Sequence, residues 1–143
     1  MSADDAGSTE PATATGGGDA RKGTATYVVL IVGDADRWWT SMNEEQRKAG
    51  YAEYNRFGEE LTKRGHKITG GAELHRTDEA KRIAPGGGPA TDGPFAELTE
   101  QVGGFYQIET DDLDDLLDCC QIIAKVGEGI EVRRTVSAED RDS

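Results

Sequence analysis

The feature that most constrains this chain is an unbroken apolar run, YVVLIV at residues 27–32, which ends at Gly33. β-Branched and aromatic residues favour extended backbone, so the run predicts a strand that begins at Thr26. Successive side chains of a strand point to opposite faces, so a strand that is apolar throughout needs cover on both faces. The run therefore predicts a central strand of a sheet.

The clearest helix signal lies between Ser41 and Gly65. Ser41 and Glu44 have the spacing of a capping box, in which each side chain satisfies a free backbone N–H at the helix start. Apolar residues recur at helical spacing along one face: Tyr54, Phe57 and Leu61. Gly65 supplies the C-terminal stop. We expect the preceding segment 34–40, which holds Trp38 and Trp39, to be a loop.

The other elements are predicted as strands at 67–75, 80–84, 101–109 and 130–136, and as a second helix at 111–126. In the first of these strands the period of two places Ile68, Gly70, Ala72 and Leu74 on one face. Gly103 and Gly104 mark a bulge or a close backbone contact in the strand at 101–109.

The order β-α-β, a hairpin, then β-α-β is typical of the split βαβ, or ferredoxin-like, α+β sandwich, with both helices on one face of an antiparallel sheet. The other face then needs cover, and a second copy provides it most simply. We therefore expect a homodimer that forms an α+β barrel. The domain is predicted at 24–136, between tails at 1–23 and 137–143 whose composition is typical of disorder.

The net charge of −12, from 28 acidic and 16 basic side chains, disfavours binding to nucleic acid or to anionic membrane surfaces. No stretch approaches the roughly 20 apolar residues of a membrane helix, and the N-terminus lacks the pattern of a secretory signal. Cys119 and Cys120 are adjacent, which disfavours a relaxed disulfide and favours a reducing, cytoplasmic location.

Neither a metal nor a cofactor is expected. A zinc site would need a cysteine together with both His66 and His75, and these residues lack ligand spacing. The acidic run at 111–118 fits oxygen ligands of a divalent metal less well than a solvated helix start. The glycines at 86–88 lack the lysine and the helix of a phosphate-binding loop.

Two motifs occur together, DGPFAE at 92–97 and EQVGGFYQI at 100–108, supported by YNRFGEEL at 54–61 and GGAEL at 70–74. In these motifs the chain, over residues 26–136, resembles the DGPF-domain branch of the YCII-related family. The resemblance implies a ferredoxin-like fold that assembles into a dimeric α+β barrel.

The chain departs from the family pattern at two places. Thr99 stands where the family usually has a lysine, and the first helix carries Tyr51, Tyr54 and Asn55 but not the histidine that pairs with an aspartate in many members. Family members resemble dehydrochlorinases and lactone isomerases in fold, and DGPF proteins often accompany sigma factors. The resemblance leaves open whether this chain is an enzyme.

The DGPF loop supplies the first candidate site. Asp92 is a candidate general base, or a group that holds a ligand hydroxyl, with Gly93, Pro94, Phe95 and Glu97 around the ligand. In the structural alternative, Gly93 takes a positive φ in a turn and Phe95 fills the core. Glu97 either joins Asp92 in a carboxylate cluster or is solvated.

Aromatic residues supply the second candidate site. Trp38, Tyr54 and Tyr106 are expected to line a small-molecule pocket, or alternatively to pack as ordinary core. His75, at a strand end, is a candidate proton carrier or simply an exposed histidine.

Two functions follow from these observations. The first is a dimer that binds or weakly transforms a small molecule in a cavity lined by the DGPF loop. The alternative is a non-enzymatic accessory protein whose acidic surface docks a basic regulatory partner such as a sigma factor.

Overall fold

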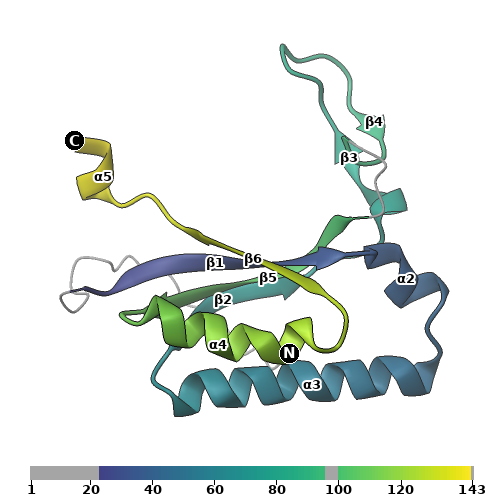
Figure 1. Cartoon of the computed structure of the whole chain (residues 1–143). Coiled ribbons are helices and arrows are strands. Elements are labelled where there is room, and N and C mark those ends of the chain that lie inside the picture. Colours follow the sequence, from purple (N-terminus) through teal and green to yellow (C-terminus); the bar gives the residue numbers. More distant parts are fainter. Residues whose placement is uncertain (1–22, 96–99, 143) are drawn as a thin grey trace.

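The structure is a computed structural model that describes residues 23–95 and 100–142. The N-terminal tail predicted at 1–23 lies outside these residues except for Gly23. The elements follow one another along the chain as β1 (Ala25–Gly33), α2 (Ala35–Thr40), α3 (Glu44–Lys63), β2 (Lys67–Glu73), the 3-10 helix η3 (Thr77–Glu79), β3 (Lys81–Arg82), β4 (Thr91–Asp92), β5 (Gln101–Thr110), α4 (Leu113–Ala124), β6 (Gly129–Arg134) and α5 (Ala138–Asp142) (Figure 1).

The main sheet has the strand order β2-β5-β1-β6, and each pair of neighbours is antiparallel. The apolar strand β1 therefore lies between β5 and β6, as its sequence predicts. Helices α3 and α4 cover the same face of the sheet (Figure 1). This order and this placement are those of the ferredoxin-like split βαβ arrangement, so the predicted fold class is confirmed.

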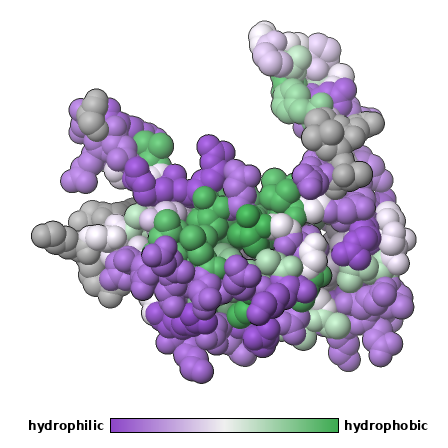
Figure 2. Space-filling view, in the orientation of Figure 1, coloured by the Kyte–Doolittle hydropathy of each residue, from purple (hydrophilic) through white to green (hydrophobic). Residues whose placement is uncertain are grey.

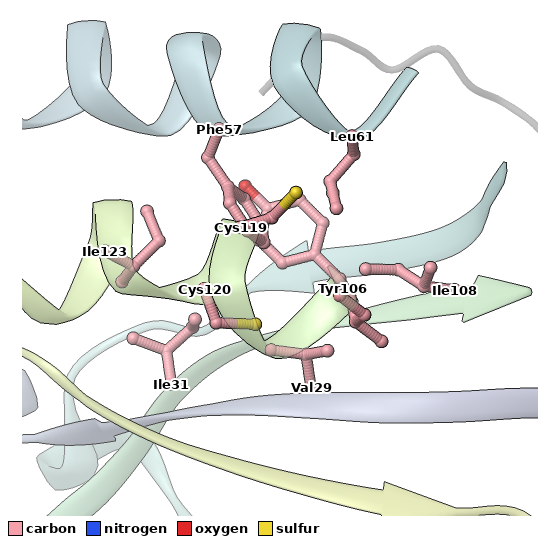
Figure 3. Close-up of a cluster of buried hydrophobic side chains, with 10 residues drawn as sticks. Val29, Ile31, Phe57, Leu61, Tyr106, Ile108, Cys119, Cys120 and Ile123 are labelled. Atoms are coloured by element: carbon pink, nitrogen blue, oxygen red, sulfur yellow. The ribbon is translucent and has the colours of Figure 1, made fainter. Parts of the chain in front are cut away.

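The core fills the space between this face of the sheet and the two long helices (Figure 3). Its buried members are Val29, Ile31, Phe57, Leu61, Tyr106, Ile108, Leu116, Cys119, Cys120 and Ile123. The rings of Phe57 and Tyr106 meet edge to face at 5.1 Å and join α3 to the sheet. Each fully buried large side chain contributes about 1.5–3 kcal/mol through removal of its apolar surface from water.

The opposite face of the sheet has an apolar centre, and no helix of residues 23–95 or 100–142 covers it. Because Val29 and Ile31 are buried under the helices, alternation directs Val28, Leu30 and Val32 to this opposite face, where they are half-buried. Figure 2 shows apolar surface along the sheet, between the hairpin β3–β4 and the C-terminal segment that carries α5. We call this surface the open face. The predicted second copy stays a prediction.

The segment 34–40, expected to be a loop, is the short helix α2. Asp34 caps it, since the Asp34 carboxylate accepts a hydrogen bond from the Arg37 N–H at 3.1 Å. The predicted capping box of α3 is also wrong. Ser41 ends α2, and the box forms two residues later, between Asn43 and Gln46, with bonds of 2.7 and 2.9 Å.

Two shifts in the register of strand pairing shape the end of the sheet near α2. The register of β1 on β5 shifts between Ile31 and Val32, which confirms the bulge predicted at Gly103 and Gly104. A second shift follows Ile68, so Ile68 pairs with the core residue Ile108 while Ala72 pairs with Phe105 on the open face. The simple alternation expected for residues 67–75 is therefore wrong, because the bulge reverses the faces within the strand.

The C-terminal tail, expected to be disordered, contains helix α5. Its start is closed by reciprocal bonds between Ser137 and Asp140, of 2.9 and 3.1 Å, and Arg134 pairs with Asp140 at 2.8 Å. Polar capping substitutes here for the apolar burial whose absence suggested disorder. No helix of residues 23–95 or 100–142 combines the length and the apolarity that a bilayer crossing needs.

Candidate functional site

A small pocket lies between α2, α3 and the bulged end of the main sheet. Its volume is about 60 Å³, and it is partly open to solvent. The lining residues come from β1 to α2, from α3, from the end of β2, from β5 and from the loop before β6: Ile31, Gly33, Asp34, Trp38, Trp39, Tyr51, Tyr54, Ala72, Glu73, Leu74, Gly103, Gly104, Phe105, Tyr106 and Glu128.

Aromatic rings at right angles to one another form one wall of the pocket. The Trp38 ring meets Tyr51 edge to face at 4.9 Å and Tyr54 at 6.4 Å, with interplanar angles of 75° and 79°. Tyr51 and Tyr54 are neighbours on one helix face, since they are three positions apart on α3. Gly50 admits the indole ring, because a Cβ at this position would lie 2.7 Å from Trp38 Cη2 and Cζ3.

The Trp38 indole carries a polar atom without a partner. Its Nε1–H is buried and makes no hydrogen bond to any residue that the structure describes. The Trp38 indole lies close enough to the Tyr51 hydroxyl to lower the pKa of Tyr51 slightly against the larger effects of burial and Glu73, but the two groups do not have the geometry of a hydrogen bond. A buried donor without an acceptor costs free energy, so this atom marks a position that an added acceptor would stabilise.

Phenol groups and carboxylates meet at the polar side of the pocket. The Tyr51 hydroxyl donates to both Glu73 carboxylate oxygens, at 3.1 and 3.0 Å. Burial, and next the negative charge of Glu128, raises the pKa of Tyr54. Burial, and next the charge of Glu73, raises the pKa of Tyr106. Both phenols are therefore neutral hydroxyls at physiological pH, able to donate or accept.

Glu128 is the half-buried carboxyl group of the pocket. Gly33 leaves the room that it occupies, since a Cβ at Gly33 would lie 2.4 Å from Glu128 Oε1. Burial is the main cause that raises its pKa; Arg37 opposes this effect and Asp34 adds to it. Among the described residues Glu128 makes no hydrogen bond and no ion pair, so it is available to a ligand.

Of the residues predicted for a ligand site, Trp38, Tyr54 and Tyr106 lie together in this pocket. The sequence argument did not assign a role there to Tyr51, Glu73 or Glu128. Glu128 stands between two glycines, Gly127 and Gly129, and Gly127 has a positive φ of 109°. A carboxylate in such a turn was the available signal, although a turn alone does not tell which way its side chain points.

Asp92 lies elsewhere in the chain, on the hairpin β3–β4 that projects beyond the end of the sheet (Figure 1). Its side chain is 82% exposed and pairs with Lys81 at 2.6 Å. This ion pair lowers the pKa of the Asp92 carboxyl group. The expectation that Asp92 faces the cavity is therefore not met within one chain, because the hairpin forms its own small sheet.

The rest of the DGPF loop follows Asp92 on the hairpin. Gly93 has a positive φ of 94°, as the turn interpretation predicts, and its N–H donates to the Ala80 carbonyl at 2.7 Å. Arg82 donates to the carbonyl of Pro94 at 3.0 Å. Phe95 is 73% exposed, so the prediction that it fills the core is wrong. Glu97 lies outside the described residues.

His75 is exposed beside the pocket. Its ring stacks on Trp39 at 5.2 Å with an interplanar angle of 11°, and its Nδ1 lies 3.5 Å from a Glu79 oxygen. Trp39 lines the pocket and His75 does not. The structure therefore places His75 behind a wall residue, separated from the pocket interior by the indole.

A buried histidine joins the C-terminal ends of α3 and β5 to the first turn of α4. His66, 4% exposed, bonds through Nδ1 to Thr110 and through Nε2 to Asp115, both at 2.7 Å. Arg64 holds the other Asp115 oxygen at 2.8 Å. Cys119 completes a group whose donor atoms lie within 4.8 Å of one another. Burial raises the pKa of this thiol, and a metal ligand must be a thiolate, so we interpret the group as a structural clamp.

The fold and the pocket define the class: a ferredoxin-like α+β domain with a small aromatic and acidic pocket at one end of its sheet. The model of the YCII-related domain matches residues 25–138, so the chain belongs to the YCII-related family. The match spans nearly the same residues as the domain predicted at 24–136. No curated protein matches the chain.

Proposed function

We propose that this protein binds a small molecule in the pocket between α2, α3 and the sheet. The observation that carries the proposal is a pair of polar groups in a wall of aromatic side chains, the Trp38 indole N–H and the Glu128 carboxyl, which have no hydrogen-bond partner within residues 23–95 and 100–142. Small-molecule sites combine mostly apolar walls with a few convergent polar groups. Glu128 is also the group best suited to carry a proton, because its raised pKa lies closer to neutrality.

Protein-observed NMR tests this function with the full chain and a library of small fragments. The two tryptophans of the chain both line the pocket, so two indole Nε1–H resonances report on its occupancy. We expect fragments to shift these resonances together with the amides of Gly33, Ala72 and Gly103. Shifts confined to the hairpin around Asp92 would contradict the proposal and support the DGPF loop as the site.

A matched pair of variants separates pocket binding from general effects on the fold. Tyr54→Phe removes a hydroxyl that faces the pocket, whereas Tyr27→Phe removes one from a residue that does not line it. We expect the first variant to weaken fragment binding and the second to leave it unchanged. A protein that takes no fragment but captures a basic partner would favour the accessory-protein alternative.

We propose in addition that a second copy covers the open face. Val28 and Leu30 are half-buried there, Phe105 pairs opposite Leu30 and Val102 opposite Val32, so the strand pair offers an apolar patch that ends at Gln107, opposite Val28. Contiguous apolar patches on soluble domains mark interaction sites. Light scattering coupled to gel filtration should give the mass of two chains, and Leu30→Lys should give the mass of one. A single-chain mass for the unmodified protein would contradict this assembly.

A further inference from the structure

We propose that the ligand of this pocket is a small organic cation, a protonated amine attached to an apolar body. The inference rests on the proposed function and adds the chemical class of the ligand. It is carried by two properties of the lining, the sign of its charged groups and the arrangement of its rings.

The charged groups of the lining all have the same sign. Asp34, Glu73 and Glu128 reach the pocket from three separate elements, the β1–α2 junction, β2 and the loop before β6. None of the lining residues, all of them within the described part of the chain, is Lys, Arg or His. The site therefore offers acceptors and negative charge, which repel anionic ligands and which a neutral ligand can hydrogen-bond but cannot neutralise.

Two arginines near the pocket do not neutralise it. Arg47 donates to the backbone carbonyls of Trp38 and Met42, which directs its guanidinium to the α2–α3 turn. Arg37 acts on Glu128 through its charge, but forms no ion pair with it and does not line the pocket. A buried carboxyl without a paired cation is the group that a cationic ligand stabilises most.

The aromatic wall offers the second recognition element. Trp38 stands at 75° to Tyr51 and at 79° to Tyr54, so the lining holds three aromatic rings, and the plane of Trp38 is steeply inclined to those of the two tyrosines. A ring face carries partial negative charge, and cations bind over Trp and Tyr faces, most strongly where water is excluded. The hydroxyls of Tyr54 and Tyr106 add oxygen acceptors for the N–H groups of an ammonium ion.

Three molecules of nearly equal shape and different charge test the inference: benzylammonium, benzyl alcohol and benzoate. Each is titrated at constant ionic strength and neutral pH, with tryptophan fluorescence excited where the ligands do not absorb. Both tryptophans line the pocket, so the signal comes from the site itself. We expect benzylammonium to bind about tenfold or more tightly than benzyl alcohol, and benzoate to bind weakest.

Charge-neutral variants assign the effect to the pocket. Glu128→Gln and Glu73→Gln should each remove most of the preference for benzylammonium over benzyl alcohol. Glu131→Gln makes the same change of charge on β6, at a residue that does not line the pocket, and should leave the preference intact. Thermal unfolding of each variant verifies that it is folded, and Glu73→Gln keeps an oxygen that can accept from Tyr51.

The outcomes separate this inference from the proposed function. Equal affinity for benzyl alcohol and benzylammonium, or tighter binding of benzoate, overturns the cation inference and leaves a small-molecule pocket. A preference that Glu131→Gln reduces as much as Glu128→Gln also overturns it, because the effect would then come from net charge. If none of the three molecules changes the tryptophan fluorescence, the cation inference is overturned as well. The NMR experiment with fragments then decides whether the pocket binds small molecules at all.

Discussion

Two glycines of helix α3 should respond in opposite directions to the same substitution. An alanine at Gly50 would place its Cβ 2.7 Å from Trp38 Cη2 and Cζ3, whereas at Gly58 the nearest atom, Ile68 Cδ1, lies at 4.0 Å. Each substitution gains about 0.8–1 kcal/mol of helix propensity. Only Gly50→Ala overpacks, at a cost of about 1–3 kcal/mol. Gly58→Ala should therefore stabilise the fold, and Gly50→Ala should destabilise it by about 1 kcal/mol.

Urea unfolding of both variants measures this difference, and tryptophan fluorescence of the folded Gly50→Ala protein should report a displaced Trp38. A double variant provides the control. In a Trp38→Leu background the overpacking is relieved, so Gly50→Ala should now stabilise the protein as Gly58→Ala does. If Gly50→Ala stabilises the unmodified protein as much as Gly58→Ala, the close packing of Trp38 on α3, and with it the aromatic wall, is wrong.

Three further predictions concern the structural clamp around His66, the loss of stability at low pH and the DGPF hairpin. His66→Ala should lower the free energy of unfolding by about 2–4 kcal/mol, since it leaves a buried cavity and removes two hydrogen bonds. The control His75→Ala, at an exposed position, should change the free energy of unfolding by less than about 0.5 kcal/mol. Equal effects of the two variants in urea unfolding would contradict the structural clamp. The side chain and then the backbone of Thr77 donate to Asp36, at 2.6 and 2.9 Å, and hold the pKa of Asp36 below its ordinary value of 3.8. The stability that Asp36 contributes is complete above pH 3.8 and is lost as the pH falls through the lower pKa of the folded state. In the Asp36→Asn variant Tm should therefore fall less steeply as the pH is lowered below 3.8. An equally steep fall of Tm in this variant would exclude the role of Asp36. Asp92→Ala should leave fragment binding unchanged, and loss of binding in NMR titrations would restore Asp92 as a ligand residue.

The fold was predictable because its signals are local and repeated. The apolarity of residues 27–32 on both faces requires a central strand, and it lies between β5 and β6. The two helices show one-sided apolar spacing, and the glycine pair at 103–104 marks the bulge. Helix caps were less predictable, because Ser41 and Asn43 are both good caps and only the short helix α2 decides between them.

The candidate site was only half predictable. Trp38, Tyr54 and Tyr106 attract attention as large aromatic residues, and aromatic residues line most small-molecule sites. Glu73 and Glu128 are two of many carboxylates in a very acidic chain, and their inward direction depends on the register shift after Ile68 and on the turn at Gly127. The DGPF motif is prominent in sequence, yet its hairpin leaves the sheet, because two-residue strands pair with each other instead of with β5.

The position of β1 in the sheet also determines when this protein can fold during synthesis. β1 is the first strand made, but its partners are β5 and β6, and the pairing with β6 extends to Arg134. At ribosomal rates of about 5–20 residues per second, β1 waits about 5–20 s for its last neighbour. Both edges of its apolar run are unpaired until β5 is complete at Thr110, and the edge that β6 covers stays unpaired until Arg134 is made. We therefore expect a nascent chain of this protein to bind chaperones that hold extended apolar segments, and a truncation before β6 leaves one edge of β1 unpaired.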